Sequence, residues 1–248
     1  NITTESAIIT WIDPDIEHAQ WRVYYKAEGE ENYTTLTVTD QLAELSGLTQ
    51  ATNYTLYVQT DCGTSDNLSQ TIPITFSTKA VPITTFPYYQ DFEGLVALPF
   101  NAEYKVIGNN KWVVGNATGV LSETNNYGES NSLYISNTNG QTHNYDQYSI
   151  TDAYVIVPIT FGSDAEYTIS FDYKVIGEST DDYLWVVIAD TNTILTTGIP
   201  NGTPILNLAN GIDTWTNFTY SSPLLSNTTK NLIFYWTNDS GGSYGIPA

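Results

Sequence analysis

The stretch EYTISFDYKVIGESTDDYLWVVIAD, residues 166–190, carries the pattern that decides the fold. Apolar and polar side chains alternate in YTISFDYKV (167–175), and YLWVVI (183–188) is a second short apolar run. A period of two places successive side chains on opposite faces of an extended strand. The stretch therefore predicts two antiparallel strands, with Asp181 and Asp182 in an exposed turn at the tip of the hairpin.

The same strand pattern recurs on both sides of this hairpin. It is present in AIITW (7–11), WRVYY (21–25), YTLYV (54–58) and LIFYW (232–236). Turn signals such as Asp13-Pro14, Asn139-Gly140 and Asn201-Gly202 separate the runs. Low Lys and Arg content with abundant Thr, Asn, Tyr and Ile disfavours helices, and no window has helical periodicity. These features predict an all-β chain built of antiparallel sandwiches.

Charge and composition exclude several classes of partner. The 248 residues include 27 acidic and 7 basic side chains, for a net charge of -20. Such a chain repels phosphate backbones and anionic lipid, so we expect no binding to nucleic acid or to a membrane surface. No apolar run approaches the roughly 20 residues of a membrane span, so we expect no membrane insertion. One cysteine, Cys62, rules out an internal disulfide framework. Without an initiator Met or a signal peptide, the chain is expected to be an internal piece of a larger protein.

A composition change near residues 78–85 predicts a boundary between two domains. STKAVPITT (77–85) contains a proline and follows the strand run IPITFST (72–78). We expect a first domain at 1–80 and a second at 81–248, with separate cores and a short linker at 81–85.

Residues 1–79 resemble a fibronectin type III module. The resemblance rests on a strand with inward positions Ala7, Ile9 and Trp11, on Tyr24 in the next strand, and on Leu48 followed by Tyr54. It implies a tyrosine corner, in which the phenol of Tyr54 bonds back to the backbone. It also implies a first strand before Asn1. We expect Trp11 and Tyr54 to pack in the core instead of lining a binding groove, so the module is expected to be a spacer.

The segment PYYQDFEG (87–94) supplies the main candidate metal ligands. If the segment is extended, Asp91 and Glu93 lie on one face and Phe92 on the other. Two carboxylates on one face suit calcium, although calcium takes six to eight oxygens. Asn131 and Asp152 are weaker candidate ligands. The alternative for Asp91 and Glu93 is a solvated strand face. The alternative for Asn131 is a turn-forming role, and for Asp152 a turn cap.

The second domain resembles the jelly-roll modules of the cleaved-adhesin or choice-of-anchor J group in Bacteroidetes surface proteins, which are similar to MAM domains. PYYQDFEG, NSLYIS (131–136), TDAYVIVPI (151–159) and the hairpin at 166–190 follow the order of that family. The resemblance implies a structural calcium ion near Asp91 and Glu93, a last strand after Ala248, type IX secretion and a role in a cell-surface adhesin.

Binding is the expected function of the second domain. Sugar rings stack on exposed aromatic side chains, and the candidates in turn-rich stretches are Trp112, Tyr127, Tyr145, Tyr148 and Tyr244. A protein ligand on a cell surface is the other expected partner. The alternatives are purely structural stalk modules, in contact only with neighbouring modules of the same long chain, and accessory modules of a secreted hydrolase.

Catalysis is not expected. His18 and His143 belong to no paired zinc-ligand motif. Carboxylates of a glycosidase flank the substrate and usually come from different strands, whereas Asp91 and Glu93 are two residues apart.

Overall fold

The computed structural model describes residues 1–14, 20–61, 72–93, 103–115, 131–163, 166–178, 181–222 and 225–241. Within these ranges the chain is all-β, and none of them holds a helix long and apolar enough to cross a membrane. Every strand run predicted from the alternation is a strand in the structure. The chain forms two compact units, Asn1–Val81 and Pro82–Ala248.

The first unit is a sandwich of two antiparallel sheets. One sheet pairs β1 (Ser6–Thr10) with β4 (Leu42–Ser46). The other has the order β3-β2-β5-β6, from β2 (Trp21–Ala27), β3 (Thr34–Val38), β5 (Asn53–Thr60) and β6 (Ile74–Ser77). Inward side chains of both sheets, including Val23, Leu45 and Leu56, are buried between them.

The predicted tyrosine corner is present in the first unit. The phenol oxygen of Tyr54 accepts a hydrogen bond from the Thr49 N–H at 2.8 Å. Leu48 is buried next to it in the core. Trp11 contacts Trp21 edge to face, with ring centroids 6.1 Å apart.

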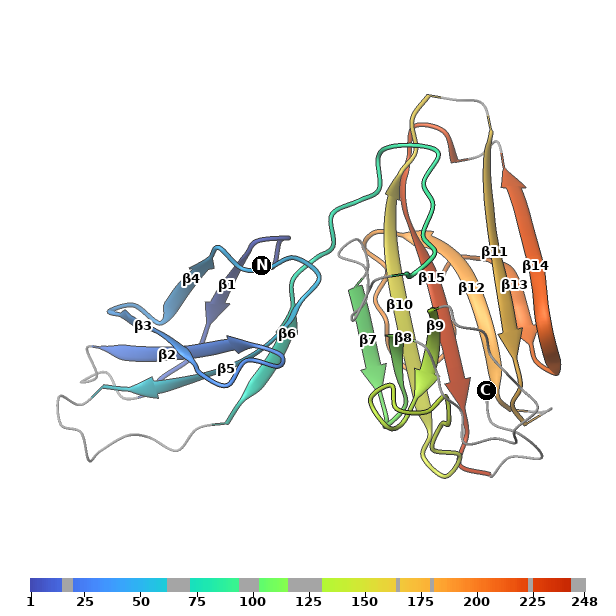
Figure 1. Ribbon diagram of the computed structural model, residues 1–248. Helices are drawn as coiled ribbons and strands as arrows, with labels where there is room; N and C mark the ends of the chain where they lie inside the picture. Colours follow the sequence, from blue (N-terminus) through green and yellow to red (C-terminus); the bar gives the residue numbers. More distant parts are fainter. Residues whose placement is uncertain are drawn as a thin grey trace. The chain divides into compact units, whose positions relative to one another are not determined.

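The second unit is a larger sandwich (Figure 1). Its five-stranded sheet has the order β13-β12-β15-β10-β7. These strands are β7 (Glu103–Ile107), β10 (Thr151–Thr160), β12 (Tyr183–Asp190), β13 (Thr203–Ala209) and β15 (Thr229–Asn238). The opposite layer consists of two separate pairs, β8 (Lys111–Gly115) with β9 (Ser132–Ser136) and β11 (Tyr167–Val175) with β14 (Ile212–Ser222).

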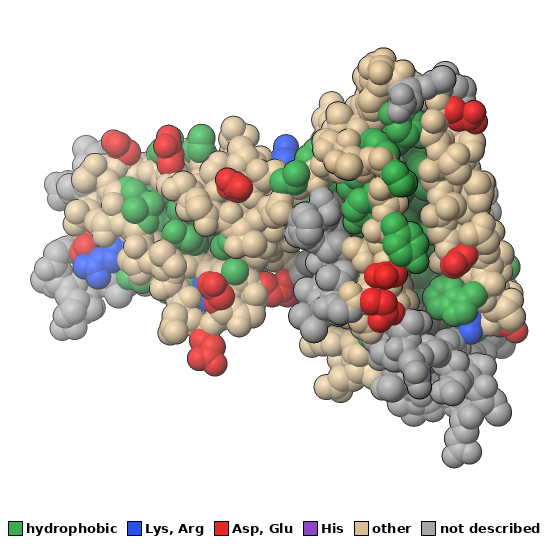
Figure 2. Space-filling view, turned by 45° about the horizontal axis from the view of Figure 1, so that its top comes forward, with side chains coloured by type: hydrophobic (Ala, Val, Ile, Leu, Met, Phe, Trp, Pro, Cys, Tyr) green, Lys and Arg blue, Asp and Glu red, His purple; other side chains and the backbone are tan. Residues whose placement is uncertain are grey.

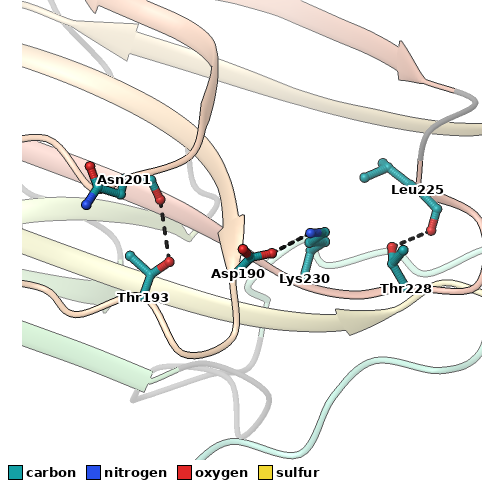
Figure 3. Close-up of polar contacts among 6 residues, drawn as sticks. All are labelled: Asp190, Thr193, Asn201, Leu225, Thr228 and Lys230. Carbon is teal, nitrogen blue, oxygen red and sulfur yellow. Dashed lines mark hydrogen bonds and ion pairs between the residues drawn. The ribbon is translucent and has the colours of Figure 1, made fainter.

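Both faces of the five-stranded sheet are covered by side chains. Ala153 and Trp236 belong to the core cluster on one face. On the other face the rings of Tyr154 and Tyr235 stack at 4.7 Å between centroids, within a second cluster of buried residues. At the end of the sheet Lys230 of β15 pairs with Asp190 of β12 (Figure 3).

Nearby loops are closed by short polar contacts. The Thr193 hydroxyl donates to the Asn201 carbonyl at 3.4 Å and the Thr228 hydroxyl to the Leu225 carbonyl at 2.6 Å (Figure 3). These bonds hold the turns on either side of the Asp190–Lys230 pair.

A buried amide pair joins distant parts of the second unit. Asn110 and Asn238 are both fully buried, and the Asn110 Nδ2 donates to the Asn238 Oδ1 at 2.8 Å. The same Asn238 oxygen accepts from the Trp236 Nε1 at 3.2 Å, and its Nδ2 donates to the Ser149 carbonyl at 2.9 Å. The pair therefore ties the turn before β8 to the end of β15 and to the loop before β10.

Two local expectations were wrong. Ile83, placed in the linker, is buried and forms a parallel bridge with Ile159; its N–H donates to the Pro158 carbonyl at 2.9 Å. Asp182, placed in an exposed turn, is 1% exposed and accepts hydrogen bonds from the Tyr145 hydroxyl and the Glu178 N–H. The partner of Ile83, Ile159, and one partner of Asp182, Tyr145, are distant in the sequence, so local sequence patterns do not predict these contacts.

Candidate functional site

The second unit contains a groove between β9 and β11, with a cavity volume of about 1140 Å³. Every residue in the runs 131–135 and 166–176 lines it. Successive residues of a strand point to opposite faces, so an unbroken run of lining residues means that the edge of the strand borders the cavity. The edges of β9 and β11 are therefore the walls of this space, which we call the β9–β11 groove.

The floor of the groove is a sheet face. β10 contributes only every second residue, Val155, Val157 and Ile159, and β15 contributes Leu232, Phe234 and Trp236 in the same way. All six side chains are apolar. Figure 2 shows hydrophobic side chains along a hollow in the second unit, with acidic side chains at its rim.

The segment 86–93 also borders the groove, but it is not the predicted strand. Phe92 has φ of 63°, in the left-handed region, which breaks the extended backbone. The Asp91 Oδ1 accepts the Glu93 N–H at 3.0 Å and closes a tight turn. The alternation argument for Asp91 and Glu93 is therefore wrong, because it assumes an extended chain.

Three of the four candidate metal ligands nevertheless come together at the rim. The Glu93 Oε1 accepts the Asn131 N–H at 2.7 Å, and the Asn131 Nδ2 donates to the Phe92 carbonyl at 3.2 Å. Asp91 lies in the same turn as Glu93. Asp91 and Glu93 are exposed. The described ranges hold no group of three or more His, Cys, Asp or Glu side chains arranged for a metal ion.

Asp152 does not join them. It is buried on β10, where its Oδ1 accepts hydrogen bonds from the Tyr235 hydroxyl and from the Gly198 N–H. It alternates with Ala153, whose side chain belongs to the core between the layers, so it points to the opposite face of the sheet. It helps to fix the loop that covers that face.

The predicted aromatic ligand residues fall into three groups. Trp112 and Tyr145 are buried, contrary to expectation; the Trp112 Nε1 donates to the Ala153 carbonyl at 3.0 Å, and Tyr145 packs edge to face on Trp236 at 5.4 Å. Tyr148 is 71% exposed. Tyr127 and Tyr244 lie outside the described residues.

Other exposed aromatic side chains border the groove. Tyr88, Tyr89 and Trp215 are 42%, 83% and 56% exposed. Asn217, two residues after Trp215 on β14, is the register partner of Asp172 on β11. Its Nδ2 donates a hydrogen bond to the Asp172 Oδ1 at 2.8 Å. A sequence signal was available for Trp215, because it is an aromatic residue among polar ones in the outward positions of IDTWTNFTYSS (212–222).

Most of the charged side chains that line the groove are acidic. Among the described residues that line it, the carboxylates are Asp91, Glu93, Glu166 and Asp172, and the one lysine is Lys174. His143 also lines the groove, and burial, with a smaller effect of the Lys174 charge, lowers the pKa of its imidazole. His143 is therefore neutral at neutral pH and does not offset the carboxylates.

Fold and site together define an all-β chain that consists of a fibronectin type III domain followed by a second β-sandwich. The fibronectin assignment rests on residues 1–76, which match the family model described as "Fibronectin type III domain". No curated protein matches the chain.

Two solved structures show distant similarity. One is described as "Chitinase ChiA74 from Bacillus thuringiensis", with 11% identity and a TM-score of 0.27 over 99% of this chain and 26% of the chitinase chain. The other belongs to a study titled "Structural basis for the promiscuous specificity of the carbohydrate-binding modules from the beta-sandwich super family", with 10% identity, a TM-score of 0.31, and coverage of 98% and 89%. This chain thus spans about a quarter of the chitinase chain.

Proposed function

We propose that the chain is a non-catalytic part of a secreted, extracellular protein, in which the fibronectin type III domain is a spacer and the second sandwich binds a glycan chain. The observation that carries the proposal is the set of exposed rings Tyr88, Tyr89 and Trp215 along the rim of the β9–β11 groove. The apolar faces of sugars stack on such rings. The Asp172–Asn217 pair beside Trp215 offers the acceptors and donors that sugar hydroxyls need.

Two kinds of parent protein fit this role. An accessory module of a secreted hydrolase needs only a non-catalytic surface that keeps a polymer within reach, and the groove rim meets that need. A module of a cell-surface adhesin uses the same surface to hold a glycan or a protein on another cell. We place the hydrolase accessory first, because the exposed rings along the groove rim suit a long glycan chain. A stalk with no ligand is the third role.

Binding of the full chain to a glycan array tests the proposal. We expect Trp215→Ala to weaken binding by about tenfold or more, since loss of an aromatic stacking contact costs about 0.5–1.5 kcal/mol beyond its buried area. Tyr148→Ala is the comparison variant, because Tyr148 is as exposed but does not line the groove; an equal loss of binding in this variant would place the glycan site at the loop before β10 instead. An array without any bound glycan contradicts the proposal and favours a stalk.

We also propose that calcium binds beside Asp91 and Glu93. What supports the site is that Asp91 and Glu93 lie in one turn and that Asn131, just before β9, donates its backbone N–H to the Glu93 Oε1. The described residues fit a calcium ion only in part, since they supply fewer than the six to eight oxygens that calcium takes. Backbone carbonyls and water would complete the shell.

The calcium proposal has a direct thermal test. A ligand that binds only the folded state stabilises it, by about 2.7 kcal/mol at a hundred times Kd. Calcium should raise the melting temperature of the wild type, and Asp91→Ala should abolish the rise. Asp213→Ala, which removes an exposed carboxylate that does not line the groove, is the control. Identical melting in calcium and in chelator contradicts the site.

A further inference from the structure

Two strands of the second unit have an edge that no other described strand pairs with. β9 pairs with β8 and β11 pairs with β14, and the opposite edges of β9 and β11 are the walls of the β9–β11 groove. A free strand edge presents a row of N–H and C=O groups that readily pair with another chain. We propose that the groove binds one extended polypeptide strand of a protein partner, with apolar side chains at every second position and basic side chains among the others.

The floor fits the side-chain period of such a strand. β10 and β15 offer apolar side chains at every second position, and an inserted strand places its own side chains toward the floor with the same period of two. Val157 and Phe234 on the floor, with Ile169 and Phe171 on β11, are only partly buried. A bound strand would cover all four of them.

The size of the groove favours a polymer over a small molecule. Its volume of about 1140 Å³ is above the range of roughly 300–1,000 Å³ of small-molecule pockets. An apolar space of this size differs from the close packing of protein interiors. Addition of a strand to exposed sheet edges is a recurring mode of peptide recognition, in which main-chain bonds give affinity and alternate side chains give specificity.

Charge defines the partner further. In the part of the groove that the structure describes, Asp91, Glu93, Glu166 and Asp172 outnumber the one basic lining residue, Lys174. Potentials of opposite sign favour association, so the partner strand should carry Lys or Arg outside its apolar positions. A second copy of this chain, with a net charge of -20, would be repelled.

This inference is independent of glycan binding. The glycan proposal depends on the exposed rings of Tyr88, Tyr89 and Trp215, whereas strand binding depends on the edges of β9 and β11 and on the floor. Loss of one function without the other therefore separates the two proposals.

The first test uses the full wild-type chain and a synthetic peptide. The probe has nine residues, the length of β11, alternates valine with threonine, and carries lysine at both ends. Fluorescence anisotropy measures its affinity, and amide hydrogen exchange measures protection of β9 and β11. The matched control is the same peptide with N-methyl groups on alternate residues. The control should bind at least about tenfold more weakly, because it cannot donate backbone hydrogen bonds to one of the edges.

The second test changes the protein. Val157→Lys places a charge on the floor of the groove, whereas Ile156→Lys places it on the opposite face of the same strand. Only Val157→Lys should weaken peptide binding, again by about tenfold or more. Circular dichroism checks that both variants are folded.

Several results would overturn the inference. Equal binding of the N-methylated peptide means that the edges are not used. Slow exchange at β9 and β11 without peptide means that the chain itself already pairs these edges. If an oligosaccharide displaces the peptide and itself fails to bind the Val157→Lys variant, the floor of the groove binds a glycan and not a polypeptide strand.

Discussion

Replacement of Asn238 by alanine should destabilise the second unit strongly. The change removes the oxygen that accepts from the Asn110 Nδ2 and from the Trp236 Nε1, and it removes the amide that donates to the Ser149 carbonyl. Asn110 keeps Thr151 as a second partner at 3.0 Å. The structure gives the buried Trp236 N–H only this one hydrogen-bond acceptor, so it is left without one among the described contacts.

The magnitude follows from these contacts. An unsatisfied buried donor costs about 1–3 kcal/mol, and each ordinary hydrogen bond that is lost adds about 0.5–1.5 kcal/mol. We expect a loss of roughly 3 kcal/mol in the free energy of unfolding. Because ~1 kcal/mol shifts the melting temperature of a domain of this size by about 2–4 °C, the transition should fall by roughly 6–12 °C.

Urea and thermal unfolding, followed by tryptophan fluorescence, measure the change. Asn201→Ala is the matched control, because Asn201 is exposed and the contact from Thr193 goes to its backbone carbonyl, which alanine keeps. Its effect should stay within about 0.5 kcal/mol. The first unit has its own core and serves as an internal reference. An effect of Asn238→Ala no larger than that of the control would refute the role of the buried amide pair.

Three more predictions concern stability. Gly177→Ala places a Cβ at 2.7 Å from the Asp182 Cβ and should cost about 1–3 kcal/mol; unchanged urea unfolding would contradict this close contact. Burial raises the pKa of the Asp182 carboxyl, so its contribution to stability is complete below the ordinary value of about 4 and is lost as the pH rises through the raised value. Asp182→Asn should therefore flatten the loss of stability as the pH rises above about 4, and parallel curves for variant and wild type would show that Asp182 does not cause it. Tyr54→Phe removes the acceptor of the Thr49 N–H and should cost about 0.5–1.5 kcal/mol in the first unit, with no change in the second.

The strands and the first domain could be predicted from the sequence because their signals are local. Alternation in 167–175 and 183–188 marks strands directly, and the spacing of Leu48 and Tyr54 marks the tyrosine corner. The two-sheet architecture of each unit follows from the need of each strand to bury one face.

The site was less predictable, because long-range contacts and one backbone angle decide it. Phe92 has a positive φ although it is not a glycine, so the sequence does not predict the turn at 91–93. This turn, and not the alternation of an extended strand, brings Asp91 close to Glu93. Trp112 is buried in the core between the layers, where its indole N–H donates to the carbonyl of Ala153, 41 positions later in the chain. No local pattern encodes such a contact.

The bridge at Ile83 has a mechanical consequence if the chain is pulled from both ends. Tension that enters the second unit through residue 82 reaches first the two backbone hydrogen bonds of Ile83, to the Pro158 carbonyl and from the Thr160 N–H, each 2.9 Å long. These bonds pass the pull to β10, a central strand of the five-stranded sheet. Breaking these two bonds and exposing the buried Ile83 side chain would lengthen the connection while the sheet itself stays paired.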